Sequence, residues 1–352
     1  MARTRQSGAK AKCLAWLLFI GLGSAGANAA PTANDLLAAL QNATAPAQCS
    51  AVQEEIEFSR TGLKTAGPAN NHVRMIGYRY WDHQRIAYKL ESWSLVEDHL
   101  AASSPSNLIR MIARRDDVFT YTHFSGKRTR NLSMTSDKAG VESNRSLLEG
   151  EEDFGSFLDG YLADVNGTIT LVGLARRGHT RVLPEQQTIG NAPCWVVESQ
   201  GEFGTLHIWV APGEDFNAVK FTLEEGESPV FKDESGAPFK SGGKRFDQAA
   251  TTVVNGRKLI SAGRLVNTAT RRDGTAVIET VQVKRVNVAL APNFELLHAF
   301  ELDDVPSGTL VHISGAVASP IQYVWQDGRA VWRWTCEWGK TAPFPFSWLG
   351  DR

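Results

Sequence analysis

The sequence predicts a mainly β protein built on a curved antiparallel sheet, and three observations support this. Short stretches rich in Val, Ile, Tyr, Trp and Thr recur with alternating apolar positions, the period of half-buried strands. Glycine-bearing pairs that favour tight hairpins separate many of them: Asn166-Gly167, Asn255-Gly256, Asp273-Gly274 and Asp327-Gly328. The apolar parity slips near Lys284-Arg285, which predicts a β-bulge that curls the sheet.

Residues 1–29 have the composition of a secretory signal peptide. Four basic residues precede the apolar run from Cys13 to Leu22, and small residues end the segment at Ala29. The run is about ten residues, roughly half the length that spans a bilayer, so a retained anchor is the weaker interpretation. We expect cleavage after Ala29 or Ala30 and an exported, soluble protein of the periplasm or cell envelope.

Charge and cysteine content narrow the partners of the exported chain. Loss of the four basic residues moves the net charge from −1 to −5, and the remaining basic pairs are scattered among acidic residues, so we expect no nucleic-acid partner. An oxidising compartment permits one disulfide among Cys49, Cys194 and Cys336, and the sequence leaves the pair open. No ligand spacing indicates a metal or another cofactor.

The first predicted element is a helix over residues 32–43. Leu36, Leu37 and Leu40 recur at helical spacing, and Thr32 or Asn34 can cap the start. Two alternating stretches between Ile76 and Leu90 then predict a hairpin around Asp82-His83-Gln84, and residues 117–124 predict a further strand. We take Glu54, Glu55 and Glu57 as a solvated strand edge.

The clearest hairpin lies between Ala192 and Pro212. Its second strand directs Leu206, Ile208 and Val210 to one face of the sheet. The residues between them, Thr205, His207 and Trp209, point to the other face.

Two insertions interrupt the pattern, at about 135–165 and 226–244. In the first, a polar run over 136–145 precedes apolar residues from Phe154 to Leu162 at helical spacing, which predicts a short amphipathic helix. The second is rich in glycine and proline and predicts a long loop. We expect a single β-rich domain over 30–352, with an apolar tail at 343–348 lying across the sheet.

The sequence contains no convincing catalytic motif, so we predict that the protein is not an enzyme. Ser241-Gly242-Gly243-Lys244 matches Ser-x-x-Lys only formally, and it falls in the predicted flexible loop. The histidines are spread singly, and an enzyme would need distant residues such as His123 and His207 to converge.

Tryptophan is the residue type with the strongest functional signal. Nine tryptophans follow the signal segment, and Trp332 and Trp334 share one face of the last predicted strand. Such an apolar surface has to be covered, either by the helix over 32–43 or by an apolar ligand.

The order of these elements resembles the LolA/LolB-like superfamily of lipoprotein carriers. The signal peptide, the amphipathic first helix and a strand that begins near Cys49 are followed by a meander, as in that superfamily. The segment 193–219, with Cys194-Trp195-Val196-Val197-Glu198 and Trp209-Val210-Ala211-Pro212, is similar to lipoprotein-sorting-like envelope proteins of planctomycete type. The stretch Tyr323 to Gly328 fits the closing part of the same pattern.

The resemblance implies an incomplete β-barrel around a helical lid, with an apolar concavity that shelters acyl chains. A lipid or an acylated protein is the ligand expected on this basis. The expected contact residues are Leu36, Leu37, Leu40, Phe119, Tyr121, Trp195, Trp209, Trp332 and Trp334. The alternative is an envelope interaction or stress-sensing module that uses the same fold to bind a protein, without lipid transport.

Overall fold

The computed structural model describes residues 30–62, 71–83, 85–96, 99–100, 107–113, 118–124, 129–135, 155–164, 167–227, 239–302, 305–314 and 321–334. The chain divides into Met1–Pro31 and Thr32–Arg352, and the account below concerns the second unit. The predictions for the signal peptide, the polar run over 136–145 and the tail over 343–348 lie outside the described residues.

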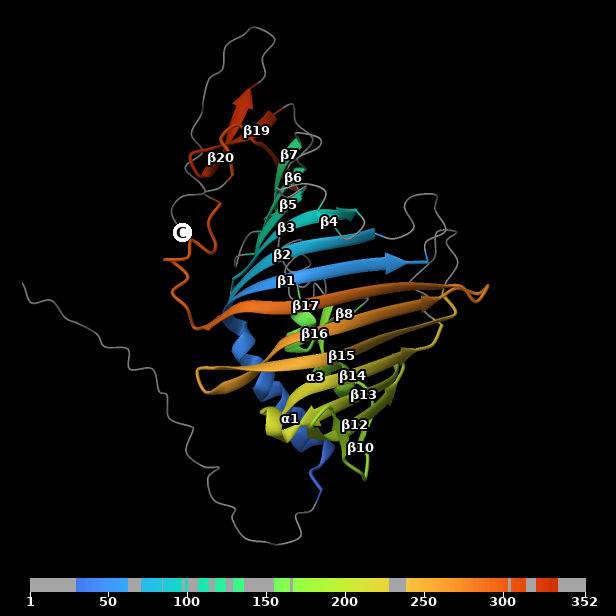
Figure 1. The fold of residues 1–352 in the computed structure, drawn as a ribbon. Helices are drawn as coiled ribbons and strands as arrows, with labels where there is room; N and C mark the ends of the chain where they lie inside the picture. Colours follow the sequence, from blue (N-terminus) through green and yellow to red (C-terminus); the bar gives the residue numbers. More distant parts are fainter. Residues whose placement is uncertain are drawn as a thin grey trace, which may run out of the picture. The chain divides into compact units, whose positions relative to one another are not determined.

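Two meanders form one large sheet (Figure 1). The first contains β1 (Cys49–Thr61), β2 (Asn71–Asp82), β3 (Ile86–Val96), β4 (His99–Leu100), β5 (Asn107–Ala113), β6 (Val118–Phe124) and β7 (Thr129–Thr135). The second contains β10 (His179–Val182), β11 (Gln187–Ile189), β12 (Ala192–Gly201), β13 (Gly204–Ala211), β14 (Asn217–Glu225), β15 (Ser241–Val254), β16 (Arg257–Thr270) and β17 (Ala276–Leu290). Antiparallel pairing of β17 with β1 joins them.

Three further strands extend the β7 edge: β18 (Leu310–Ser314), β19 (Ile321–Gln326) and β20 (Arg329–Trp334). β18 lies parallel to β7, which departs from the purely antiparallel prediction. A long crossover after β17 brings the chain to the edge of the sheet at β7, where β18 pairs. No hairpin therefore dictates the direction of β18. No described pairing connects β20 with the opposite edge at β10 and β11, so the described sheet is not closed into a barrel. The mainly β class and the curved, open sheet are as predicted.

Local turn chemistry explains most hairpins. Asn255 and Gly256 both have positive φ angles, 51° and 77°, as do Asp327 and Gly328 at 49° and 78°. Such pairs match the twist of antiparallel strands, so these predicted turns are confirmed. The hairpin between β12 and β13 is confirmed as well, with Gly201 paired to Gly204.

The predicted bulge lies at Val286. Gln53 pairs with Asn287 whereas Glu54 pairs with Arg285, so Val286 is the extra residue of β17. Val286 is 47% exposed and Arg285 only 7% exposed. The bulge therefore turns Arg285 into the interior, where it faces Glu54.

The N-terminal helix is confirmed as α1 (Ala33–Thr44). Thr32 and Asp35 form a reciprocal capping box, which satisfies amide groups at the helix start. Leu36, Leu37 and Leu40 are at most 1% exposed, so the apolar stripe of the helix is wholly covered.

The first insertion folds differently from the predicted amphipathic helix. Its described part forms the single turn η4 (Ser156–Asp159) and β8 (Tyr161–Asp164); β9 (Gly167–Thr170), which pairs with β8, and the short helix α3 (Leu171–Arg176) follow it. Gly155 and Gly160, both with φ of 77°, flank η4 and end the turn at each side. We call α1 together with residues 155–164 and 167–178 the plug.

The plug covers one face of the sheet, which we call the plug face (Figure 1). Side chains from strands β12 round to β6 join the plug in one hydrophobic cluster, so the sheet curves around it. A second cluster lies on the opposite face, where Phe300, Leu302 and Val305 cover Ile112 and Leu132. The crossover segment thus covers the face that carries Phe119 and Tyr121, two of the residues expected to contact a ligand.

The second insertion is shorter than predicted. β15 begins at Ser241, and Gly242, Gly243 and Lys244 pair with Glu225, Glu224 and Leu223. The Ser-x-x-Lys tetrapeptide is therefore part of a strand and not of a flexible loop, because its glycines fit into a ladder with β14.

Candidate functional site

The structure brings four of the predicted ligand residues to the plug face. Leu36, Leu37 and Leu40 pack in the same cluster as Leu206, Ile208 and Val210, and the half-buried Trp195 packs against it. The predicted parity of β13 is thus confirmed.

The other described members of the predicted site lie on the opposite face. Phe119 and Tyr121 belong to the cluster with Trp325, and Trp209 packs with Cys194 and Val196. Alternation explains the separation: on β6 Val118 points to the plug face, so Phe119 and Tyr121 point away from it. Both faces of this sheet are apolar, and composition alone therefore does not identify the face under the helix.

For several of the remaining predicted residues the structure describes the backbone but not the side chain. The side chains of Trp332 and Trp334 lie outside the described part, although their backbones pair with Tyr323 and Ile321 in β20 and β19. The side chain of His123 is also outside it, and Nε2 of His207 lies 3.2 Å from Oε2 of Glu198. Cys49 and Cys194 are free thiols, and Cys336 is outside the described residues.

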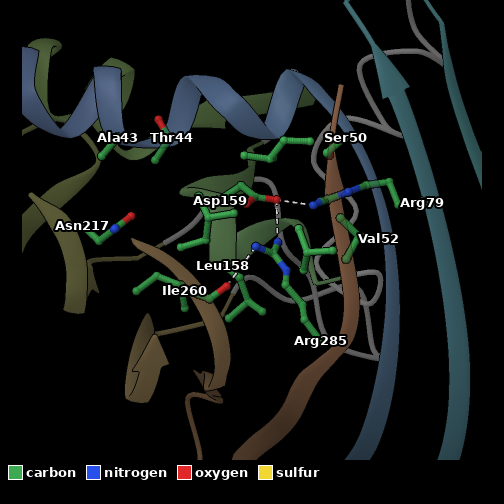
Figure 2. A pocket seen from close by; sticks show the side chains of 13 residues that line it. Ala43, Thr44, Ser50, Val52, Arg79, Leu158, Asp159, Asn217, Ile260 and Arg285 are labelled. Carbon is green, nitrogen blue, oxygen red and sulfur yellow. Dashed lines mark hydrogen bonds and ion pairs between the residues drawn. The ribbon is translucent and has the colours of Figure 1, made fainter. Parts of the chain in front are cut away.

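A buried cluster of four charged side chains lies between the plug and the sheet, and Figure 2 shows three of them, Arg79, Asp159 and Arg285. Glu54 comes from β1, Arg79 from β2, Arg285 from β17 and Asp159 from η4. Nη2 of Arg285 donates to Oδ2 of Asp159 at 2.6 Å, and Nη2 of Arg79 donates to the same oxygen. Nε of Arg285 lies 3.1 Å from Oε1 of Glu54, and its Nη1 donates to the Ile260 carbonyl at 2.9 Å.

The sequence carries a signal for this cluster that parity reveals. On β1 the inward positions are Val52, Glu54 and Ile56, and Glu54 is 1% exposed, so the prediction of a solvated edge is wrong for this residue. Arg79 likewise lies between the inward positions Gly77 and Trp81 on β2. A charged residue at an inward, otherwise apolar position was the signal that could have revealed this cluster. It does not identify the partner, because Asp159 is 80 residues from Arg79 along the chain.

The two carboxylates of the cluster respond differently to burial. Burial has the largest influence on Glu54 and raises its pKa above the ordinary glutamate value, although Arg79 and Arg285 act in the opposite direction. Burial also opposes ionisation of Asp159, but the ion pairs with Arg285 and Arg79 together outweigh it and lower its pKa. Asp159 is therefore the carboxylate that the two arginines hold ionised.

Two small cavities lie under the plug. One lies beside Arg79, Asp159 and Arg285 and has a volume of about 10 Å³, close to the space that a single water molecule needs. The neighbouring cavity is of similar volume and lined mainly by apolar residues, among them Leu40, Phe157 and Phe246. Among the described residues, the protein's own side chains fill the plug face, so a larger ligand requires the plug to move.

Glycine at position 155 allows the close approach of η4 to the cluster. A Cβ atom there would lie 2.7 Å from Oε2 of Glu54, whose carboxylate is buried and held by Arg285. We expect Gly155→Ala to lower the free energy of unfolding by about 2–4 kcal/mol, from the positive φ and the clash together. Urea denaturation followed by tryptophan fluorescence measures the loss.

Gly190→Ala is the matched control for that substitution. Gly190 also has a positive φ, 59°, but a Cβ there meets nothing within 4 Å. It should cost about 1–2 kcal/mol for the backbone conformation alone. Equal losses in the two variants would show that contact with Glu54 does not constrain η4.

The fold and the site together define a class of protein: an open, curved β-sheet with two apolar faces, one of which is covered by a helical plug that buried ion pairs tie to the strands. Within the described chain, no helix combines the length and apolarity needed to cross a membrane. Nor do the described His, Cys, Asp and Glu residues form a group of three suited to a metal ion.

No protein-family model matches the sequence, and a search of curated proteins finds no match. Among solved structures, a DUF1329 family protein from Desulfovibrio piger is 8% identical, with a TM-score of 0.40 over 78% of this chain and 98% of that chain. Lipovitellin, in a structure of its lipid–protein interactions, is 10% identical, with a TM-score of 0.26 over 69% and 26%. The ywiB protein from Bacillus subtilis is 7% identical, with a TM-score of 0.16 over 68% and 94%. Similarities this low carry no argument about function.

Proposed function

We propose that this is an exported binding or carrier protein that shelters the acyl chain of a lipid or an acylated protein on the plug face. The observation that carries the proposal is the construction of that face: a continuous apolar wall covered by a separate amphipathic helix and a short insertion. The helix α1 takes no part in strand pairing, so its displacement leaves the hydrogen-bond ladders of the sheet in place. The resemblance to lipoprotein carriers agrees with this function.

The energy of exchange favours such a ligand. Leaving the sheet costs the three leucines of α1 about 1.5–3 kcal/mol each, or about 5–9 kcal/mol together. Burying a 16-carbon chain in their place contributes about 12 kcal/mol at roughly 0.8 kcal/mol per methylene. The free energy gained by burying an acyl chain therefore exceeds the free energy lost when the three leucines leave the plug face.

The ion cluster suits a plug that has to be released. Buried ion pairs contribute little net stability, because water solvates the separated charges almost as well as they solvate each other. Asp159 therefore gives the plug a defined position on the sheet without the strong attachment that further apolar contacts would provide.

Asp159→Asn tests the proposal, since the amide keeps the size of the side chain and removes its charge. With a fluorescent monoacylglycerol of 16 carbons as a neutral probe, we expect about 5–30-fold tighter binding than in the wild type, as a plug weakened by about 1–2 kcal/mol opens more often. Fluorescence titration gives the affinity, and native mass spectrometry of the exported protein identifies co-purified lipid.

Asp247→Asn serves as the control, because Asp247 also binds two arginines, Arg245 at 3.0 Å and Arg264 at 2.9 Å, but on the exposed surface. It should leave the affinity for the probe unchanged. Failure of both the wild type and Asp159→Asn to bind the probe, with no lipid in the purified protein, would exclude the proposed function.

An envelope interaction module remains the second candidate. The segments that motivated it lie outside the described residues, but Leu296 and Leu297, 79% and 45% exposed, form an apolar pair in the turn that Asn293 initiates. This pair supports a protein contact at that turn.

A further inference from the structure

We infer that the ligand of the plug face carries a single anionic group, a carboxylate or a phosphate, which binds Arg79 and Arg285 in the place of the Asp159 carboxylate. This inference rests on the proposed function and names the chemistry of its ligand. Three features of the cluster support it, namely the division of charge, the donor geometry and the polarity of the adjoining cavities.

The charges are divided unequally between plug and sheet. Glu54, Arg79 and Arg285 belong to strands, whereas Asp159 belongs to the plug. The four charges balance only while the plug is in place, and displacement of Asp159 leaves the sheet with one excess positive charge. Once an acyl chain excludes water from the face, an unpaired charge there costs several kcal/mol, so the ligand-bound form requires a replacement anion.

The donor geometry fits an oxyanion. Two guanidinium groups from different strands converge on Oδ2 of Asp159, an arrangement that recognises carboxylate and phosphate oxygens. Nε of Arg79 has no hydrogen-bond partner among the described residues, although the Arg79 side chain is only 1% exposed. Arg79 therefore has a buried donor left for an anion with more oxygens than Asp159 presents there.

The polarity along the plug matches an amphiphile. The cavity beside the arginines has three charged residues in its lining, whereas its neighbour has none and is lined mainly by apolar residues such as Leu40, Phe157 and Leu171, together with uncharged Thr44, Thr170 and Asn217. The two cavities share Thr44, Leu158, Asn217 and Ile260, so they adjoin. An anionic head at the arginines would thus place its chain directly under α1.

Three probes with the same 16-carbon chain test this inference: palmitate, palmitoyl lysophosphatidate and neutral 1-palmitoylglycerol. Calorimetric titration of the exported full chain should give at least about tenfold tighter binding of an anionic probe than of the neutral one, the effect of one or more charge-assisted hydrogen bonds. Tighter binding of palmitate identifies a carboxylate ligand, and tighter binding of lysophosphatidate identifies a phosphate; either supports the inference.

Two variants move the preference in opposite directions. Arg79→Gln leaves the strands with no excess charge and should remove the preference, whereas Asp159→Asn leaves an unpaired arginine charge and should increase the preference above that of the wild type. Because Asp159→Asn is expected to gain binding, its result does not depend on a variant that fails to fold. An unchanged preference in Asp159→Asn overturns the inference.

The wild-type result separates this inference from the proposed function. Equal binding of all three probes overturns the anionic ligand and leaves an acyl-chain carrier. If neither the wild type nor Asp159→Asn binds any of them and no lipid co-purifies, both are overturned.

Discussion

Arg285→Met is expected to lower the free energy of unfolding by about 3–5 kcal/mol, because it removes one partner from a buried ion cluster. The Arg285 side chain is 2% exposed and bonds Glu54, Asp159 and the Ile260 carbonyl. Methionine fills a similar volume, so the loss of stability comes from the missing charge and not from a cavity. Glu54 and Asp159 are then left with Arg79 as their sole basic partner in the cluster. Urea denaturation monitored by circular dichroism measures it.

Arg264→Met provides the control. Arg264 pairs with Asp247 at 2.9 and 3.1 Å, but its side chain is 31% exposed, so removing it should cost about 0–1 kcal/mol. Adding Glu54→Gln to Arg285→Met should recover part of the loss, because the double variant contains no unpaired glutamate charge. A loss from Arg285→Met no larger than that of the control would contradict the role assigned to the cluster.

Phe246→Ala is the second substitution with a large expected effect, a loss of about 3–5 kcal/mol. Phe246 on β15 is 1% exposed, and its ring lies 5.8 Å from that of Phe157 in the plug and 5.5 Å from that of Phe221. A Cβ atom on Gly263 would lie 2.2 Å from this ring, so the sheet is shaped to hold it. Truncation therefore leaves a cavity between plug and sheet.

Phe119→Ala separates loosening of the plug from general loss of stability. Phe119 is 6% exposed and contacts Trp325 edge-on at 6.3 Å on the opposite face. Both variants should lower the midpoint of urea unfolding, but only Phe246→Ala should speed hydrogen exchange of the α1 amides in the folded protein. Faster exchange of α1 in both variants would show that the plug is not an independently opening unit.

Some elements could be predicted because their causes lie within a few residues of sequence. The capping box of Thr32 and Asp35 and the leucine spacing specify α1, and Asn255-Gly256 specifies its hairpin whatever surrounds it. The parity slip before Val286 located the bulge for the same reason. The amphipathic helix expected in the first insertion does not form, because Gly155 and Gly160 both have a positive φ and limit the helical segment to a single turn.

The sequence by itself determined the mainly β class, the meander, the first helix and the turn positions, since alternation, capping and positive φ are local properties. Only the tertiary structure decided which of two apolar faces lies under the plug, that β18 runs parallel to β7, and that Asp159 meets Arg79 and Arg285. These outcomes depend on contacts between residues far apart in the chain. Alternation along a strand shows that a charged residue faces inward, but it does not identify the residue with which that charge pairs.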